Sequence, residues 1–355
     1  MNKLRILLIS NTKDIKRGTG IARFTLHLYE GLKNQGIDTK LLVSEPHDIP
    51  LGKLVNHSLI LPVKTIKSLQ NYTCLHFLTP AAAIYSSFFN RIRPCVVTFH
   101  ELSFLSYETH GFHYYTFLAP FWYKLATKVL RIIVPTIQTR DDLIRYLKVP
   151  DSKITVVNNA ISDYLRPLVD PLKKLDEKEE YSIGYLGTLG KKKRVDYAIK
   201  AFYIFKKKYP HIKAKFLICG RKDMEYQKLK ALVRILNLEK EVIFLGFVES
   251  ELQAYNLFDV FVFPSEWEGL GYPILEAQKC GVPVIVRARA RIPLEASLHA
   301  IKAYSVEDMA DKMYLLLTDL DYRNRVVQAG LEYTSRFTIE RMAREYIKVY
   351  EDVCL

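Results

Sequence analysis

Cysteine is scarce in this 355-residue chain, and its five cysteines form no C-x-x-C pair. Without that spacing the sequence offers neither a zinc-ligand set nor a redox dithiol, so we expect no structural zinc and no disulfide. Four of the five lie in or beside apolar runs, which is typical of buried thiols in a reducing compartment. The cysteines are Cys74, Cys95, Cys219, Cys280 and Cys354.

Long hydrophobic runs and internal repeats are also missing. No apolar stretch approaches the roughly 18 residues that a membrane span requires. Residues 1–10 (MNKLRILLIS) are too short for the apolar part of a signal peptide and are typical of a buried strand. We therefore expect a cytoplasmic protein. The composition, 49% apolar and 25% charged residues, is that of a globular chain long enough for two domains.

Acidic residues are outnumbered: the net charge is +14, and +9 of it falls in residues 1–165. Such a balance favours an anionic partner, which could be nucleic acid, a phosphorylated small molecule or an acidic membrane face. The basic residues are dispersed among acids, and no known nucleic-acid recognition module is visible. A nucleic-acid-binding protein is therefore the weaker alternative, and we do not expect nucleic acid as a partner.

Short β-branched runs alternate with longer amphipathic stretches, which predicts an α/β chain. The strands expected in the first half lie at 5–10, 39–43, 58–62, 74–78, 95–100, 131–135 and 154–157. Those expected in the second half lie at 182–187, 213–220, 241–246, 260–264 and 282–286.

A polar, proline-containing stretch at 166–180 separates the two series, and its dense charges are typical of a linker. The sequence thus predicts two doubly wound, Rossmann-like domains, at 1–165 and 181–337. We expect them to face a central cleft in which polar ligands bind.

The stretch 268–276 (EGLGYPILE) places two carboxylates eight residues apart, across a glycine-rich turn. Glu268 follows a predicted strand, and Glu276 falls in the first turns of a short predicted helix. Pro273 suits the first position of that helix, and Gly281 suits the position just past its end. We therefore expect the amino end of this helix to face the cleft.

A helix amino end offers free N–H groups and a partial positive charge to an anion, and glycines let a ligand approach the backbone. Carboxylates would repel the anion unless they bind hydroxyl-bearing parts of the same ligand. A carboxylate can accept two hydrogen bonds from a vicinal diol, so one acid for a ribose and one for a second sugar predict a nucleotide-sugar site. The alternative is a solvated helix entry with an acid favoured by the dipole.

Residues 244–286 (FLGFVESELQAYNLFDVFVFPSEWEGLGYPILEAQKCGVPVIV) resemble the signature of the retaining glycosyltransferases of family 4, the glycosyl transferases group 1, including its E-x7-E pair. Resembling motifs extend over nearly the whole chain. The resemblance implies the two-domain GT-B fold, with an acceptor-side domain at 1–165 and a donor-binding domain at 181–337. It also implies that the amphipathic segment at 338–355 crosses back to the first domain.

The same resemblance assigns the residues around the acid pair. It implies that Glu276 binds the nucleotide ribose and that Val248 contacts the nucleoside. Glu268, expected to be catalytic, would hold the donor sugar together with the backbone of the three residues after it. These are Gly269, Leu270 and Gly271.

Phosphate requires cations, and the stretch 185–196 (YLGTLGKKKRVD) supplies four after a glycine-broken strand end. In the family an arginine directly after the glycine and a lysine further along clamp the diphosphate. Lys193 matches that lysine and is expected to be catalytic. Thr188 stands where the arginine is expected, so Arg194 or Lys192 would have to compensate. The alternative is a solvated basic loop.

The first domain contributes two further candidates. Gly18 and Gly20 lie between the first strand and its helix, where backbone N–H groups could approach the diphosphate, although a tight turn needs the same residues. His100 ends a predicted central strand and is followed by Glu101. A lone histidine is more often structural, but the family places a histidine here against the donor sugar, and we expect His100 to be catalytic.

For two further segments the sequence leaves two interpretations open. Residues 104–123 hold nine aromatics, with Lys124 and Lys128 just after, and they either pack in the first domain or rest on an anionic membrane surface. Residues 287–296 (RARARIPLEA) alternate three arginines, which in an extended segment would share one side. These arginines would bind an anionic acceptor or face solvent.

The sequence therefore predicts a metal-independent, cofactor-free retaining glycosyltransferase acting on a nucleotide-diphosphate-sugar. The acceptor would be a glycan or a lipid-linked or protein-linked group, and peripheral contact with an anionic membrane would accompany a lipid-linked one. No residue stands out as a covalent nucleophile. This fits the front-face mechanism that the resemblance implies, in which the leaving diphosphate helps to deprotonate the acceptor. The enzymatic alternatives are a nucleotide-sugar epimerase of the same architecture and a glycoside hydrolase.

Overall fold

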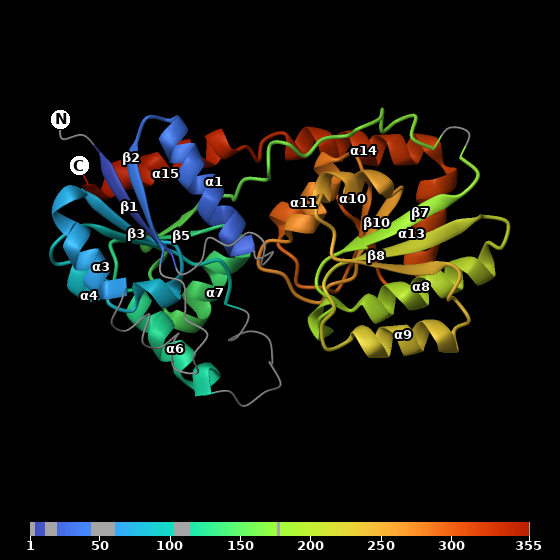
Figure 1. The fold of residues 1–355 in the computed structure, drawn as a ribbon, viewed down its shortest axis with the longest axis horizontal. Coiled ribbons are helices and arrows are strands. Elements are labelled where there is room, and N and C mark those ends of the chain that lie inside the picture. The colour runs from blue at the N-terminus through green and yellow to red at the C-terminus, as the bar shows by residue number, and fades with distance from the viewer. Residues whose placement is uncertain (1–3, 11–19, 44–60, 103–113, 176–177, 355) are drawn as a thin grey trace. The chain divides into compact units, whose positions relative to one another are not determined.

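The computed structural model describes residues 4–10, 20–43, 61–102, 114–175 and 178–354. The chain divides into two compact units (Figure 1). The first unit comprises Met1–Ala160 and Phe337–Leu355, and the second comprises Ile161–Arg336. Each unit is built on its own parallel sheet with helices on both faces, which confirms the predicted α/β fold of two doubly wound domains.

The sheet of the first unit has six parallel strands in the order β2-β1-β3-β4-β5-β6. In chain order they are β1 Arg5–Ser10, β2 Asp38–Val43, β3 Cys74–Phe77, β4 Cys95–Thr98, β5 Arg131–Val134 and β6 Ile154–Val156. The chain winds outward from β1 to β2 and then in the other direction from β3 onward. The switch point, where doubly wound sheets bind ligands at the carboxyl ends of their strands, therefore lies between β1 and β3.

Successive residues of β1 point to opposite faces of this sheet and enter two separate hydrophobic cores. Ile6 and Leu8 pack with helices α1 (Gly20–Asn34) and α15 (Ile339–Cys354). Leu7 and Ile9 pack on the other face, against the other helices that the structure describes in this unit. These are α3 Leu61–Ser68, α4 Ser86–Phe89, α6 Tyr114–Ala126 and α7 Ile137–Leu147, with short 3₁₀ turns at Leu69–Asn71, Pro80–Ala83 and Asp151–Lys153.

Helix α15 belongs to the first unit although it is the last element of the chain. Its buried side chains include Tyr346 and Tyr350, which join the core beneath α1. The two helices lie so close that a Cβ on Gly31 of α1 would stand 2.9 Å from the Cβ of Ala343. A side chain at position 31 would therefore push α15 away from α1.

One predicted strand of the first unit is wrong. The stretch expected as a strand at 58–62 ends inside helix α3, which begins at Leu61, and its first three residues lie outside the described ranges. Pro62, the second residue of α3, occupies a position where the missing proline N–H costs no helical hydrogen bond. A short apolar run with a proline therefore fits a helix start as well as a strand.

The sheet of the second unit also has six parallel strands, in the order β12-β11-β10-β7-β8-β9. In chain order they are β7 Tyr181–Leu186, β8 Ala214–Cys219, β9 Val242–Gly246, β10 Val260–Phe263, β11 Val284–Arg287 and β12 Ile301–Ala303. The edge strand β12 was not predicted. In this sheet the switch point lies between β7 and β10, so the loops that leave these two strands flank the expected ligand position.

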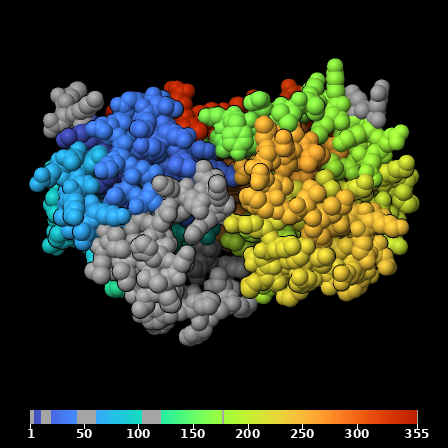
Figure 2. Space-filling model, viewed as in Figure 1, coloured from blue at the N-terminus to red at the C-terminus, as the bar shows by residue number. Residues whose placement is uncertain are grey.

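Helices cover both faces of this second sheet. Figure 1 shows α8 (Val195–Lys208) and α9 (Tyr226–Ile235) on one side and α10 (Glu251–Leu257), α11 (Tyr272–Lys279) and α14 (Leu320–Thr334) on the other. Helix α13 (Val306–Thr318) packs on α8 and on the strands β10 to β12, and α12 (Leu294–Ser297) packs on α11. Helix α9 is outermost, and its residues form part of the yellow surface in Figure 2.

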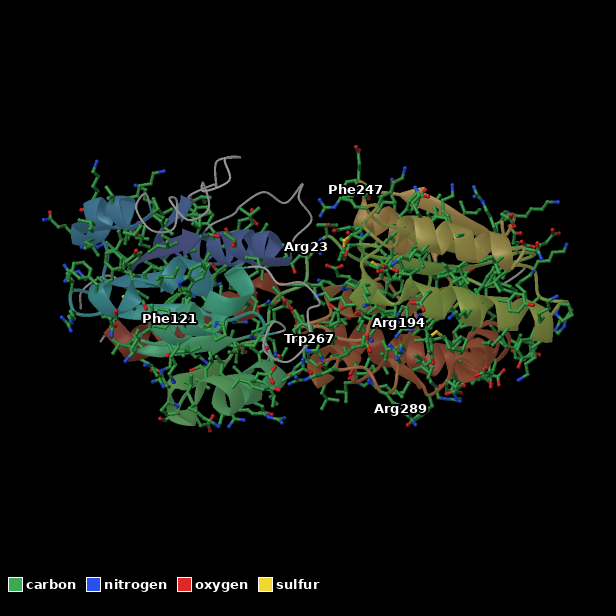
Figure 3. The ribbon with its side chains drawn as sticks, turned by 90° about the horizontal axis from the view of Figure 1, so that it is seen from below. Arg23, Phe121, Arg194, Phe247, Trp267 and Arg289 are labelled. Carbon is green, nitrogen blue, oxygen red and sulfur yellow. The ribbon has the colours of Figure 1, made fainter. Side chains whose placement is uncertain are left out.

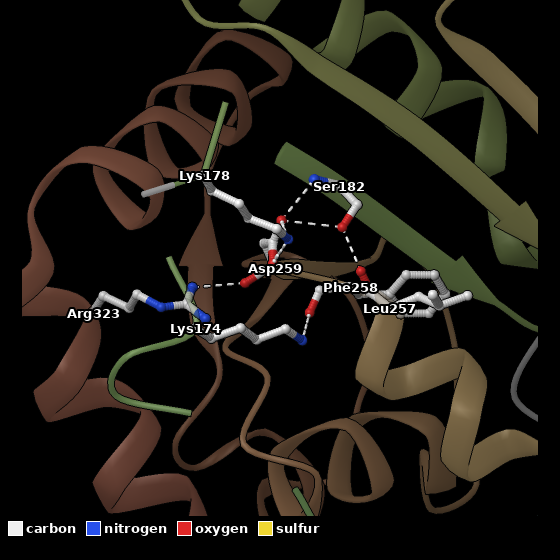
Figure 4. Close-up of polar contacts among 7 residues, drawn as sticks. All are labelled: Lys174, Lys178, Ser182, Leu257, Phe258, Asp259 and Arg323. Atoms are coloured by element: carbon white, nitrogen blue, oxygen red, sulfur yellow. Dashed lines mark hydrogen bonds and ion pairs between the residues drawn. The ribbon is translucent and has the colours of Figure 1, made fainter. Parts of the chain in front are cut away.

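The stretch 166–180, predicted to be a linker, lies within the second unit. Lys178 donates to both carboxylate oxygens of the fully buried Asp259, at 2.6 Å each, and Lys174 donates to the carbonyl of Phe258 at 2.5 Å (Figure 4). Asp259 also accepts from the backbone N–H of Ser182 at 2.8 Å, and Arg323 donates to the Asp259 carbonyl at 2.7 Å. The sequence suggested that this segment is solvated, but its lysines hold it to the second unit by an ion pair with a buried carboxylate and by a hydrogen bond to a backbone carbonyl.

The aromatic segment at 104–123 is only partly described, because residues 103–113 lie outside the described ranges. Within α6, Tyr123 packs edge-on against Phe99 with ring centroids 5.5 Å apart, and Lys124 donates to the carbonyl of Leu147. Phe121 is 61% exposed (Figure 3). The contact of Tyr123 thus supports the interpretation that this segment packs within the first unit, while Phe121 lies on the surface.

Among the helices of the described ranges, none is both long enough and apolar enough to cross a membrane. The four cysteines of the strands and helix ends, Cys74, Cys95, Cys219 and Cys280, are buried free thiols.

Candidate functional site

The loops that follow β7 and β10 bring the predicted catalytic pair together at the switch point of the second sheet. The ammonium of Lys193, in the short 3₁₀ turn Lys191–Lys193 after β7, donates to Oε1 of Glu268 at 2.5 Å. Both side chains are largely buried, with 14% and 10% of their surfaces exposed. Because the pair is largely buried, solvent and salt screen its attraction much less than that of an exposed ion pair.

Glu268 is held by more than the lysine. The hydroxyl of Ser265 donates to the same Oε1 atom, and the Glu268 backbone N–H donates to the carbonyl of Arg291 at 3.0 Å. A parallel bridge between Trp267 and Arg291 continues this pairing. The carboxylate is therefore fixed by its own loop, by the neighbouring loop and by the segment after β11.

The basic loop after β7 is tied to the acid loop by its backbone. Glu266 donates its N–H to the carbonyl of Lys192 at 2.9 Å, and the Lys192 ammonium lies 5.4 Å from the centre of the Trp267 ring. The hydroxyl of Tyr185, inside β7, donates to the carbonyl of Thr188 at 2.9 Å. Burial, and secondarily the charge of Glu268, raise the pKa of Tyr185, so this phenol stays neutral.

Arg194 does not take the same direction as Lys193. It adopts a left-handed backbone conformation, with φ of 49°, and its guanidinium donates to both oxygens of Asp196 at 3.1 and 3.2 Å. Glu266 lies 4.0 Å from the same guanidinium. Arg194 is thus neutralised by two acids, which makes it a weaker replacement for the arginine missing at Thr188 than its position in the sequence suggests.

The second carboxylate of the pair lies in helix α11. Gly271 precedes this helix with φ of 88°, a conformation that glycine adopts without strain. The helix begins at Tyr272, so Pro273 is its second residue rather than the predicted first, and Gly281 follows its last turn as predicted. Glu276 is 1% exposed and accepts a 2.8 Å hydrogen bond at Oε2 from the hydroxyl of Tyr255 in α10.

The remaining donor-site candidates of the second unit occupy neighbouring loops. Gly269, Leu270 and Gly271 are buried between Glu268 and α11. Val248 is half-buried in the loop after β9, two strands away from β7, next to the exposed Phe247 (Figure 3). Lys193 and Glu268 thus lie on the loops at the switch point, and Glu276 lies in the helix that follows the Glu268 loop. Val248 lies on the loop of the far edge strand.

The alternating arginines after β11 do not share one side, because the segment is not extended. Arg287 ends β11 and places its guanidinium 4.9 Å from the centre of the Tyr197 ring. A turn follows, in which Ala290 donates to the Arg287 carbonyl at 3.2 Å, and Arg289 lies exposed at the surface of the second unit (Figure 3). Arg291 lies beyond the turn, beside Trp267.

In the first unit, Gly18 lies outside the described residues and Gly20 is the first residue of α1. His100 lies two residues beyond the end of β4, and its Nε2 donates to the Leu78 carbonyl at 2.9 Å. Burial of the imidazole lowers its pKa to about 4. At neutral pH His100 is therefore uncharged, and because Nε2 carries the proton, Nδ1 is left as an acceptor.

A second histidine of the first unit, His76 in β3, is wholly buried beside the sheet and was not predicted. Its Nδ1 lies 2.7 Å from the hydroxyl of Tyr350 and its Nε2 lies 2.8 Å from Oγ1 of Thr98. Burial, with a smaller effect of His100, lowers the pKa of His76 to about 3. This network joins two strands to α15 through neutral hydrogen bonds.

The His76 pKa predicts acid sensitivity. The unfolded chain binds a proton at this histidine below about pH 6.5, whereas the folded chain does not bind one until about pH 3. Stability is therefore complete above pH 6.5 and is lost as the pH falls from there toward 3, with a slope near 1.4 kcal/mol per pH unit for one proton. Urea denaturation between pH 7 and pH 4.5 should show a shallower decline for His76→Gln than for the wild type. An equal slope in both proteins would contradict the prediction, and His211→Gln, at an exposed position, is the control.

Three side chains that stabilise the site were missed in the sequence. Ser265 and Tyr255 hold the two carboxylates, and Trp267 supplies the ring beneath Lys192. Only Ser265 and Trp267 carried a signal, since both lie within three residues of Glu268. In the part of the chain that the structure describes, no group of three or more histidine, cysteine or carboxylate side chains is arranged to hold a metal ion.

Two family descriptions match the chain, one on each unit. Residues 18–163 match "Glycosyltransferase Family 4" and residues 171–333 match "Glycosyl transferases group 1". Among curated relatives, O-antigen chain mannosyltransferase B of Escherichia coli is 25% identical over 277 residues, covering 74% of this chain and 71% of the relative. An Escherichia coli UDP-Gal:alpha-D-GlcNAc-diphosphoundecaprenol alpha-1,3-galactosyltransferase is 27% identical over 300 residues, or 76% of each chain. Four other relatives are matched over only 41% to 58% of their own length.

Solved structures share the fold at low identity. Sucrose-phosphate synthase from Thermosynechococcus elongatus superposes with a TM-score of 0.79 at 17% identity, covering 98% of both chains. Anabaena HepE in complex with UDP superposes with a TM-score of 0.76 at 16% identity, covering 98% of this chain and all of that one. With two parallel six-stranded sheets and family matches on both units, the chain belongs to the glycosyl transferases group 1, glycosyltransferases of the GT-B fold.

Proposed function

We propose that this glycosyltransferase takes its sugar from a nucleotide-diphosphate donor and transfers it to an acceptor hydroxyl with retention of anomeric configuration. The observation that carries the proposal is the acid pair at the switch point of the second sheet. Glu268 is engaged by Lys193 and Ser265, and Glu276 by Tyr255. Two fixed carboxylates beside a cationic loop suit a ligand that carries both hydroxyls and phosphates.

The proposed roles are those that the family resemblance implies, and the partners of each side chain are compatible with them. Glu276, oriented by Tyr255, would accept hydrogen bonds from the ribose hydroxyls, while Glu268 and the backbone of Gly269 to Gly271 would bind the donor sugar. Lys193 would move from Glu268 toward the diphosphate and neutralise the charge that develops as the bond to the sugar breaks. His100, neutral and with Nδ1 as an acceptor, is proposed to accept a hydrogen bond from a hydroxyl of the donor sugar.

Retention is part of the proposal because glycosyl transferases group 1 of the GT-B fold are typically retaining. Glu268 and Glu276 are engaged by Ser265 and Tyr255, and the proposal gives both acids binding roles and no covalent one. In the front-face mechanism the leaving diphosphate oxygen takes the proton from the attacking hydroxyl, and the new bond forms on the face that the diphosphate leaves. The proposal assigns charge neutralisation to lysine, so activity should persist in EDTA.

The acceptor is proposed to be a glycan, most simply one linked to a lipid. One relative is named for transfer to a diphosphoundecaprenol-linked sugar and another for transfer to an O-antigen chain. A cytoplasmic protein in peripheral contact with a membrane would meet such an acceptor, and Phe121, 61% exposed, is the described candidate for that contact. A protein-linked acceptor is the alternative.

Nucleotide binding tests the donor site directly. A nucleoside diphosphate of the correct base should raise the melting temperature of the wild type, because it binds only the folded state. Glu276→Ala should abolish that shift and Tyr255→Phe should reduce it, whereas Glu239→Ala, at an exposed position, should leave it unchanged. No shift of the wild type with any base, or an equal shift in the Glu276 variant, would remove the proposal.

Product analysis then separates the reaction classes. Proton NMR of the product formed from an α-linked donor and a glycan acceptor should show an α-linkage. A β-linked product would contradict retention. Conversion of the donor sugar into its epimer without an acceptor would identify an epimerase, and rapid release of free sugar would identify a hydrolase.

A further inference from the structure

A pocket of about 440 Å³ lies at the outer edge of the second sheet, where none of the donor-site residues is found. It is formed where the edge strand β12, the turn before it and the helices α13 and α14 converge. It is lined by Leu298, His299, Ala300, Ile301, Lys302, Lys312, Tyr322, Arg325, Val326 and Ala329. The residues from α14 are spaced three to four apart and so form one face of that helix.

The lining combines basic and apolar residues. Four of its ten residues are basic, namely His299, Lys302, Lys312 and Arg325, and none of the ten is an aspartate or glutamate. The other six residues are five aliphatic residues and Tyr322, which adds a hydroxyl. This open pocket therefore offers charge to an anion and apolar contact to a carbon skeleton.

Lys302 is partly removed from solvent. It lies in the middle of β12 between two buried neighbours, Ile301 and Ala303, and its own side chain is half-buried. Burial lowers the pKa of its ammonium. It has no hydrogen bond or ion pair with any residue that the structure describes, so none of these residues offsets the cost of removing this charge from water.

The other two cations with long side chains are only weakly compensated. Lys312 lies 3.8 Å from Asp308, at the outer limit of an ion pair, and both side chains are about one-third exposed. Arg325 is exposed and free to turn toward the pocket. An anion that enters the pocket can therefore be reached by Lys302, Lys312 and Arg325 together.

The position of the pocket separates it from the donor site. The donor loops leave β7 and β10, at the switch point, whereas β12 lies at the far edge of the sheet beyond β11. Lys193, Glu268 and Glu276 do not line it. A ligand here would thus bind in addition to the sugar donor.

We propose that this edge pocket binds a phosphate group of a second ligand. An ammonium and a guanidinium form strong charge-assisted hydrogen bonds to phosphate oxygens, the guanidinium in a bidentate manner, and the Tyr322 hydroxyl can donate a further one. The aliphatic residues of the lining would contact the carbon skeleton attached to the phosphate. That phosphate belongs either to a soluble phosphorylated metabolite or to the headgroup of a phospholipid.

The test uses inorganic phosphate as the probe, in calorimetric titrations at constant ionic strength. The double variant Lys302→Met with Arg325→Gln should bind phosphate at least about tenfold more weakly than the wild type. The matched control, Lys240→Met with Arg234→Gln, makes the same charge change at two exposed positions of the second unit and should bind as the wild type does. Arg325→Gln alone, at an exposed site, gives a smaller loss without risk to folding.

Lys193→Met decides whether the phosphate ion sits in the donor loops instead. If this variant loses phosphate binding and the pocket variant retains it, the proposal is overturned. Equal weakening in the pocket variant and its charge-matched control also overturns it, as does the absence of phosphate binding by the wild type. Glycosyl transfer should be unchanged in the pocket variant at saturating donor.

Vesicle sedimentation identifies the source of the phosphate. Binding to phosphatidylglycerol vesicles that exceeds binding to phosphatidylcholine vesicles, and that falls about tenfold in the pocket variant, assigns the pocket to a lipid headgroup. Equal sedimentation of the wild type and the pocket variant, together with loss of phosphate binding in the variant, assigns it to a soluble phosphorylated ligand.

Discussion

Replacing Lys193 with methionine is expected to lower kcat/KM for glycosyl transfer by about 100- to 1,000-fold, the usual cost of removing one preorganised group that stabilises developing charge. Its ammonium is already placed 2.5 Å from Glu268, within the loops of the switch point. Methionine keeps the length and much of the apolar stem of the side chain. The measurement is the initial rate with the donor identified by thermal shift.

Two further variants isolate the cause of that loss. Lys191→Met removes an exposed cation from the same turn and should change kcat/KM by less than about threefold, since exposed charges contribute little. Glu268 is left without its cation in Lys193→Met, so the double variant Lys193→Met with Glu268→Gln should recover melting temperature but not activity. Recovery of activity in the double variant would mean that the lysine acts only by neutralising the glutamate.

Replacing Asp259 with alanine is expected to destabilise the second unit by about 3–5 kcal/mol, the usual cost of breaking a buried charge pair. This carboxylate is fully buried, accepts from Lys178 and from both the backbone N–H and the hydroxyl of Ser182, and lies between β7, β10 and the stretch 166–180 (Figure 4). Its removal would leave the Lys178 ammonium and the Ser182 N–H without this acceptor.

Tryptophan fluorescence can report on the second unit by itself. The chain has two tryptophans, and a Trp122→Phe background leaves Trp267, in the second unit, as the only one. In urea denaturation the Asp259→Ala midpoint should fall sharply in that background. The control is Asp311→Ala. The Asp311 side chain is 42% exposed and pairs with Lys208, so its removal should lower the free energy of unfolding by less than about 1 kcal/mol. A similar small loss for both variants would show that the Asp259 cluster contributes little to stability.

The architecture was largely readable from the sequence. Buried parallel strands are short, β-branched and almost continuously apolar, so eleven of the twelve strands stood out against the amphipathic helices between them. The exceptions have local causes. The edge strand β12 has only three residues, with a lysine in its centre, and the run at 58–62 contains a proline that fits the start of α3.

The sequence predicted the residues of the candidate site only where reactive side chains lie close to one another along the chain, next to glycines or prolines. Glu268 and Glu276 stood out because glycines and a proline separate them, and Lys193 because it lies in a cationic loop after a strand. Their stabilising partners did not stand out. Tyr255 precedes Glu276 by 21 residues in another helix, and one tyrosine among 23 gives no signal of its own.

By itself the sequence determined the fold class, the two sheets and the residue types at the switch point, because alternation, strand composition and turn chemistry are local properties of the chain. Which charges neutralise one another was decided only by the tertiary structure. Lys193 pairs with Glu268, whereas its neighbour Arg194 pairs with Asp196, and the linker-like lysines Lys174 and Lys178 reach a buried cluster. Electrostatic pairing depends on distance and burial in three dimensions, which a run of charges in one dimension does not specify.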